Sequence, residues 1–367
     1  MLTMRNDITK VKEINVELIK SALKELGTAT KAQIAEATEI SVATCGKILN
    51  ELCESGEVLE DAITSGGYGR PAKSYAYNGN FSLIACVYVA TDLGKVTVSA
   101  MVSNLRGEVL EEYTREIDQV TYEVLEQTIE RLVEKHGKLR VVSVGIPGYI
   151  TNGVVGLCNF VDLMGLPLKS MLQEKFQTIK VLVENDMNAA AYGFYQNNCR
   201  GRDTTIAFIY SPVDAQTGIE GKLGKDPGVE MSEEQRTLVN ISINFGAGFV
   251  SGGRILRGFS GFAGEVSFLP VVRSQEPDPV DAFVDAMAHI IGSIVPILNP
   301  EIIALTGGYF DKTTVDAIRA RCLRLIAPQH MPQIILRDNI HDEYVGGLLN
   351  LALEELSCGV MLVKRKA

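Results

Sequence analysis

The sequence lacks features that would each indicate a particular class of protein. Its seven cysteines are scattered along 367 residues, and no two of them form a Cys-x-x-Cys pair. This usage excludes a disulfide framework and a cysteine-rich zinc finger, and it favours a reducing compartment. No apolar run reaches the roughly 18 residues of a membrane span, and Asn6, Asp7 and Lys10 interrupt any signal-peptide core. We therefore expect a cytoplasmic protein with no membrane partner.

Positive charge is also scarce. Lys and Arg number 35 against 45 Asp and Glu, so the formal net charge is −10 at pH 7. This balance argues against non-specific polyanion binding by the whole surface, although it leaves room for a local basic patch. Hydrophobic residues make up 46% of the chain, which is ordinary for a globular protein. A chain of this length is expected to form two or three domains with a large core.

Residues 1–78 have the pattern of a winged helix-turn-helix, which is three helices followed by a β-hairpin. The expected elements are a helix over 11–26, a helix opened by the capping box 30–33, a helix capped by Ser41, and strands at 57–63 and 73–77 around a glycine-rich tip. Any small three-helix domain is the alternative interpretation. The short turn between the second and third helices favours the winged helix.

If this domain binds double-stranded operator DNA, its contacts are expected from the third helix and the wing. The candidate DNA-binding residues are Lys31, Val42, Ala43, Gly46, Lys47 and Arg70. Those from 42 to 47 are expected opposite the buried face of the third helix, and Arg70 at the wing tip is placed for a minor groove. A glycine inside a helix costs about 1 kcal/mol relative to alanine. Close approach to DNA would explain Gly46, and so would simple tolerance of an exposed glycine.

The charge of this domain indicates how it would bind. Residues 1–80 carry nine Lys and Arg against eleven Asp and Glu, which leaves a net charge of −2. Affinity would then depend on where the charges lie and on having two copies of the domain. We therefore expect a homodimer or a higher homo-oligomer.

From residue 82 onward strands and helices alternate, as in an α/β protein. The expected strands are at 83–92, 96–103, 109–117, 141–144, 180–183, 204–210, 238–244 and 302–306, and the expected helices at 121–136, 280–298 and 343–358. Residues 211–236 have the composition of an exposed loop. At 180–191 a strand ends in polar residues and leads directly into a helix, and this is where α/β proteins place their ligands.

Asp186 is the best candidate for a general base. It lies between the amides Asn185 and Asn188 at the start of a helix, where negative charge is favoured. A carboxylate there could take a proton from a substrate hydroxyl, or it could simply cap its helix. Glu265 could hydrogen-bond sugar hydroxyls or lie on the surface. The glycines at 246, 248, 252 and 253 could let the backbone approach phosphate or could form tight turns.

Five motifs in this order resemble those of the ROK family (repressors, open reading frames and sugar kinases). They follow the wing residues 69–71 and are found at 92–94, 144–148, 184–191, 257–265 and 299–308. The resemblance implies an actin/hexokinase-like (ASKHA) pair of α/β lobes behind the winged helix, and we expect domains at 1–78, 82–198 and 199–345 with a C-terminal helix at 346–367 returning to the first lobe. It also implies that Asp186 matches the kinase base and that a sugar is held by Asn159, Asn185, Asp186 and Glu265.

Departures from the kinase motifs bear on the function. Lys95 and Val96 stand where kinases have Gly and Thr, so a hydroxyl is lost and Lys95 is expected to fill the phosphate loop. Phe245 is expected to add bulk to a second loop that has lost half its glycines. Phe268 replaces the zinc-binding His, and the cysteine-rich zinc motif is absent from 269–298. Because phosphoryl transfer depends on positioning and electrostatics, we expect no catalysis, no cofactor and no bound metal.

The sequence therefore predicts a DNA-binding transcriptional regulator, specifically a repressor, whose kinase-like lobes sense a sugar or a sugar phosphate. Ligand binding would shift the paired winged helices relative to each other. Two alternatives stay open. One is an active ATP-dependent sugar kinase with an appended DNA-binding domain. The other is a regulator whose former ligand pocket binds no ligand and whose lobes serve only dimerisation.

Overall fold

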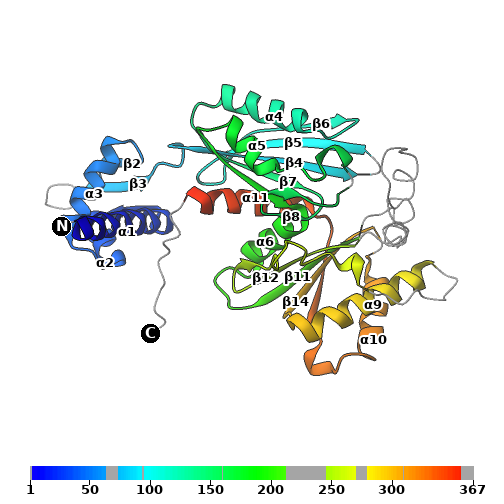
Figure 1. Cartoon of the computed structure of the whole chain (residues 1–367). Helices are drawn as coiled ribbons and strands as arrows, with labels where there is room; N and C mark the ends of the chain where they lie inside the picture. The colour runs from blue at the N-terminus through cyan, green and yellow to red at the C-terminus, as the bar shows by residue number, and fades with distance from the viewer. Residues whose placement is uncertain are drawn as a thin grey trace.

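The computed structural model describes residues 2–62, 73–92, 95–158, 160–211, 245–269, 279–308 and 310–356. Figure 1 shows an N-terminal domain at one end of the molecule, followed by two α/β lobes with two helices, α6 and α11, between their sheets. This arrangement confirms the predicted fold class.

The N-terminal domain has three helices and a three-stranded sheet. In order these elements are α1 (Leu2–Leu26), β1 (Thr28–Thr30), α2 (Lys31–Thr38), α3 (Val42–Glu54), β2 (Val58–Ala62) and β3 (Lys73–Tyr77). Strand β3 pairs antiparallel with both β1 and β2, and β1 was not predicted. Both predicted caps are present: Thr30 and Gln33 form the capping box of α2, and the Ser41 Oγ accepts a hydrogen bond from Thr44 N at 3.1 Å.

One apolar core holds this domain together. It joins side chains of all three helices and of the sheet, among them Ile19, Leu23, Ile34, Leu49 and Tyr75. The helix predicted over 11–26 lies within α1, where Ile19 and Leu23 are fully buried whereas Ile14 and Leu26 are 46% and 47% exposed.

The first lobe is built on a five-stranded sheet in the order β10-β7-β4-β5-β6. Its strands are β4 (Leu83–Asp92), β5 (Lys95–Asn104), β6 (Val109–Ile117), β7 (Leu139–Ile146) and β10 (Lys180–Asn185). Strands β4, β7 and β10 are parallel, whereas β4, β5 and β6 form an antiparallel meander. The outer face is covered by α4 (Tyr122–Lys135) and α5 (Leu168–Lys175), and a small hairpin pairs β8 (Ile150–Thr151) with β9 (Val154–Val155).

The second lobe repeats this topology, with the strand order β13-β12-β11-β14-β15. Its strands are β11 (Thr205–Ser211), β12 (Gly246–Ser251), β13 (Arg254–Ile255), β14 (Ile302–Gly307) and β15 (Gln333–Arg337). Here β11, β14 and β15 are parallel, and β11, β12 and β13 form the antiparallel meander. The strand expected at 238–244 and most of the loop expected at 211–236 lie outside the described residues.

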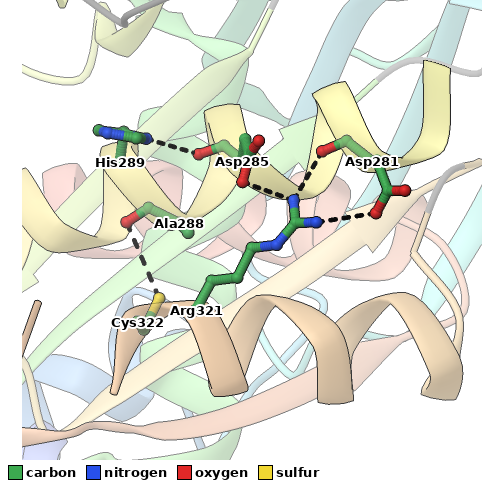
Figure 2. A network of polar contacts seen from close by, with 6 residues as sticks. All are labelled: Asp281, Asp285, Ala288, His289, Arg321 and Cys322. Carbon is green, nitrogen blue, oxygen red and sulfur yellow. Dashed lines mark hydrogen bonds and ion pairs between the residues drawn. The ribbon is translucent and has the colours of Figure 1, made fainter. Parts of the chain in front are cut away.

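Two helices, α9 (Pro279–Leu298) and α10 (Lys312–Cys322), cover the second sheet. Figure 2 shows how Arg321 joins them, because its guanidinium donates to Asp281 O at 2.7 Å, to Asp281 Oδ1 at 2.8 Å and to Asp285 Oδ1 at 2.5 Å. Among the described residues, α9 alone is long and apolar enough to span a membrane. Half of that stretch is buried, and its buried side chains belong to the core of the second lobe.

Helices α6 (Asp186–Asn198) and α11 (His341–Leu356) fill the space between the two sheets. Their backbones touch at two glycines. A Cβ added at Gly193 would overlap the carbonyl oxygen of Glu343, and one added at Gly347 would overlap that of Ala189. Helix α11 also packs on the first lobe beside Ile84. The C-terminal helix therefore contacts the first lobe, and it begins at His341, close to the start of the helix expected at 343–358.

Candidate sugar site at the start of helix α6

The first turn of α6 organises the candidate site. Strand β10 ends at Asn185, which caps α6 because its Oδ1 accepts from Asn188 N at 2.8 Å. The Asn185 Nδ2 donates to Gly148 O and to Asp186 Oδ1, both at 3.0 Å. Asp186 Oδ1 also accepts from Met187 N at 2.8 Å. The capping residue is therefore Asn185, and Asp186 is the first residue of the helix.

A buried carboxylate, that of Glu184, lies beneath this turn. It is 6% exposed, and its Oε1 accepts from Asn185 N and from Asn188 Nδ2, both at 3.0 Å. Its Oε2 accepts from Arg257 Nε at 2.9 Å and forms an ion pair with the same guanidinium. Arg257 follows β13, so the pair bridges the two lobes. Both residues belong to motifs found in the sequence. Their contact was not predicted, because no local pattern indicates a partner 73 residues away.

Close backbone packing brings Glu265 toward Asp186. A Cβ at Gly264 would overlap the carbonyl oxygen of Ala247, and one at Gly248 would overlap that of Met187. Burial is the main cause that raises the pKa of Asp186 to about 7; the hydrogen bond from Met187 N opposes this shift, and the nearby Glu265 carboxylate adds to it. Burial also raises the pKa of Glu265 to about 7. Of the four predicted sugar-binding residues, three therefore gather here, and Asn159 lies outside the described residues.

These raised pKa values predict an unusual dependence of stability on pH. Both carboxyls have unfolded pKa values near 4, so between about pH 4 and pH 7 the folded chain binds more protons than the unfolded chain. Their contribution to stability should therefore be present at about pH 4 and be lost as the pH rises to about 7. Replacing both (Asp186→Asn with Glu265→Gln) should make the unfolding midpoint fall less over this range. Parallel midpoint curves for the two proteins would contradict the prediction.

The glycine-rich segment around β12 is explained by packing and by a turn. Gly246 and Gly248 let β12 approach the first turn of α6. Gly252 and Gly253 form the turn before β13 with φ of 53° and 77°, a region that favours glycine. Of the two interpretations of these four residues, the structure supports close packing and tight turns.

Two expected obstructions of the phosphate loops are wrong. The Lys95 Nζ pairs with Glu116 Oε2 at 3.0 Å at the solvent-exposed start of β5, so it does not fill the loop. Phe245 is 4% exposed and packs against Phe283 in the core of the second lobe, with a centroid distance of 5.8 Å. Its side chain is drawn into that core by apolar burial, so it adds no bulk to the loop.

An aromatic cluster surrounds Phe268, the residue that the family resemblance places at a zinc-binding histidine. Phe268 packs on Phe262 with a centroid distance of 5.0 Å, and Phe262 meets Tyr149 edge to face at 5.4 Å. Tyr149 belongs to the first lobe and the two phenylalanines to the second, so the cluster joins the lobes. Within the described ranges, no group of three or more His, Cys, Asp and Glu side chains could hold a metal ion.

The structure places three of the six candidate DNA-binding residues on the exposed face of α3. Val42, Ala43 and Lys47 are exposed on α3, with Val42 52% exposed. The prediction that Gly46 lies opposite the buried face of α3 is wrong, because this residue is buried. The Lys31 side chain lies across it, and a Cβ added there would be 3.0 Å from Lys31 Nζ. Arg70 lies outside the described residues.

Comparisons with known proteins agree with this picture. Residues 88–219 match the model of the ROK family. The chain is 25% identical over 272 residues to a putative xylose repressor of Caldicellulosiruptor sp. (strain Rt8B.4), covering 71% of this chain and 59% of that protein. It is 24% identical over 276 residues to the DNA-binding transcriptional dual regulator NagC of Escherichia coli (strain K12), covering 72% and 59%. The chain thus aligns with 59% of the length of each of these two relatives.

Two solved structures share the fold. A ROK family transcriptional regulator, described as a homolog of the E. coli MLC protein, aligns with a TM-score of 0.65 and 17% identity over 94% of this chain and 96% of its own. The ROK hexokinase from Thermus thermophilus aligns with a TM-score of 0.54 and 18% identity over 76% and 100%. The ROK family model thus matches residues 88–219, the part of the chain that contains three of the five ordered motifs, those at 92–94, 144–148 and 184–191.

Proposed function

We propose that this chain is a sugar-responsive transcriptional repressor that binds double-stranded operator DNA through its N-terminal domain. The observation that carries the proposal is the arrangement of that domain, in which α3 exposes Val42, Ala43 and Lys47 on a domain placed ahead of two kinase-like lobes. The first turn of a recognition helix is where base contacts are usually made. The names of its relatives, a putative xylose repressor and a DNA-binding transcriptional dual regulator, support the proposal. The net charge of the domain favours a homodimeric or larger cytoplasmic assembly that presents two such helices.

The effector is a sugar or a sugar phosphate bound at the start of α6. Asn185, Asp186 and Glu265 provide one amide and two carboxyls whose pKa values are near 7. Such carboxyls can either donate a hydrogen bond or accept one, as sugar hydroxyls require. A thermal-shift screen of D-xylose, N-acetyl-D-glucosamine, their phosphate esters and ATP tests this, because a ligand that binds only the folded state raises the unfolding midpoint.

A second function, ATP-dependent sugar phosphorylation, is favoured by one observation. Asp186 is not the cap of its helix, and burial holds its pKa at about 7, as suits a general base at neutral pH. Against it, Val96 has no hydroxyl to offer a phosphate. We propose that the chain transfers no phosphate. Sugar-dependent ADP release that disappears in Asp186→Asn would establish the kinase instead.

The DNA half of the proposal predicts a measurable role for Lys47. Lys47→Ala should weaken binding to the gene's own upstream region by about 1–3 kcal/mol and relax sequence preference if the side chain reads a base edge. If it meets only phosphate, binding should weaken almost equally for all sequences, with a shallower salt dependence. Anisotropy titrations of the full chain at several salt concentrations distinguish the two.

Lys24→Ala is the matched control, because it removes the same charge from the same domain. The Lys24 ammonium lies over the Tyr77 ring, 4.6 Å from its centroid, at the end of β3 that leads into the first lobe. Its loss should change affinity far less. Equal effects of the two variants, or no sequence preference in the unmodified chain, would refute the proposed DNA contact.

A further inference from the structure

The segment that joins the N-terminal domain to the first lobe is held by the turn between β5 and β6, residues 104–108. Leu105 N donates to Gly79 O at 2.9 Å, and Arg106 Nη2 donates to Tyr77 O at 3.2 Å. The Asn104 Nδ2 donates to Asn80 Oδ1 at 2.9 Å. Three consecutive residues of the turn therefore bind the joining segment, and they do so at both backbone and side-chain atoms.

Asn104 makes this turn a fixed structure. Its side chain is almost fully buried, and its Oδ1 accepts from Arg106 N at 2.9 Å and from Glu108 N at 3.1 Å. The Arg106 side chain lies directly on Gly79, where an added Cβ would be 2.6 Å from Arg106 Cγ. Only a glycine at position 79 leaves room for the arginine in this place.

Leu105 connects two hydrophobic cores. It packs against the core of the N-terminal domain and also against a cluster of Ile84, Val141 and Ala352, on which Leu349 and Leu353 of α11 pack as well. The same turn meets α11 at Gly107, where an added Cβ would be 3.7 Å from Leu349 Cδ2. The other half of α11 touches the backbone of α6 at Gly347. Helix α6 begins at the candidate sugar site. A chain of packed groups therefore runs from the site through α6, α11 and the turn at 104–108 to the N-terminal domain.

We propose that the turn at 104–108 is the element that couples the ligand site to the DNA-binding domain, with Asn104 and Arg106 as its positioning residues. The inference rests on the proposed function. A displacement of α6 must move α11, because the two backbones meet with no side chain between them. Close-packed contacts transmit such shifts instead of absorbing them. Because coupling is reciprocal, DNA binding must in turn alter α11.

Hydrogen–deuterium exchange of the full chain tests the coupling with DNA alone. Addition of a fragment of the gene's own upstream region should slow amide exchange in residues 104–108 and in the C-terminal half of α11. Arg106→Ala should abolish this remote protection while the N-terminal domain stays protected. Gly79→Ala should do the same, because it displaces the arginine without deleting it. Arg140→Ala is the matched control, since that guanidinium bonds only to the nearby carbonyls of Gly137 and Leu139 among the described residues.

The outcomes separate the inference from the proposed function. If the unmodified chain binds no DNA, the proposed function fails. If it binds DNA and protection reaches α11 equally in the unmodified chain and in both variants, the coupling role of the turn is overturned. For any sugar of the thermal-shift panel that binds, the coupling is measured as the ratio of the DNA Kd with sugar to the DNA Kd without sugar. In Arg106→Ala this ratio should be at least fivefold closer to one than in the unmodified chain, a change within the usual range of allosteric coupling. The affinities for sugar alone and DNA alone should stay within about threefold.

Discussion

Gly347→Ala is expected to destabilise the chain by about 3 kcal/mol or more, at the upper end of what overpacking costs. The added Cβ would overlap the carbonyl oxygen of Ala189 and lie 2.5 Å from its carbonyl carbon. Backbone atoms of a helix cannot move aside as a side-chain end can. The two helices must therefore separate, and the buried contacts that α6 and α11 make with both sheets are lost with them.

The neighbouring glycine provides the control. Gly346 lies in the same helix, but a Cβ added there would have only Asn197 Nδ2 nearby, at 4.0 Å. Gly346→Ala should therefore raise stability by about 0.5–1 kcal/mol, the usual gain from removing a glycine from a helix interior. Urea unfolding followed by circular dichroism measures both. Equal midpoints for the two variants would show that the helices do not meet at Gly347.

Glu184→Ala is expected to cost about 3 kcal/mol of unfolding free energy, because it leaves several polar groups without their acceptor. Asn188 is 4% exposed, and its Oδ1 already has no partner among the described residues. Its Nδ2 would lose Glu184 Oε1, and Arg257 would lose its ion-pair partner across the two lobes. Because Asn185 and Asp186 are held by the same turn, sugar binding should weaken as well.

Another ion pair involving β10 gives a matched control. The Lys180 Nζ lies 2.9 Å from Glu355 Oε1, with the side chains 60% and 39% exposed. An exposed pair contributes little, so Glu355→Ala should change stability by less than about 0.5 kcal/mol. If unfolding measurements gave Glu184→Ala an equally small effect, the buried carboxylate would not organise the site.

Features that depend on neighbouring residues could be predicted from the sequence. Thr30 and Ser41 cap their helices as expected, because a cap is a contact between residues three apart. The hairpin of β4 and β5 also follows from two β-rich runs around a short turn. Short elements were missed, including α5 and β15. Their residues do not form a long periodic pattern, and tertiary packing decides their structure.

Features that depend on distant contacts could not be predicted. Gly46 is placed correctly on α3, but its burial results from Lys31, which reaches across from α2. The prediction that Phe245 adds bulk to the phosphate loop was based on its position in a motif. Its side chain instead packs against Phe283 in the apolar core of the second lobe. Asp186 and Glu265 were candidates from their positions in the sequence, and the family resemblance assigned them, together with Asn185, to a sugar. The pair of Glu184 and Arg257 required the fold.

The matching strand orders of the two lobes make α6 and α11 counterparts, since each follows the last parallel strand of its own sheet. Their contact is reciprocal. Gly193 faces the carbonyl of Glu343, Gly347 faces that of Ala189, and in each helix the glycine lies four residues after the carbonyl that its partner touches. A local twofold axis thus survives in the backbone although no sequence repeat is visible. In related chains, this pair of glycines should mark where the two halves of the fold meet by the same reciprocal contact.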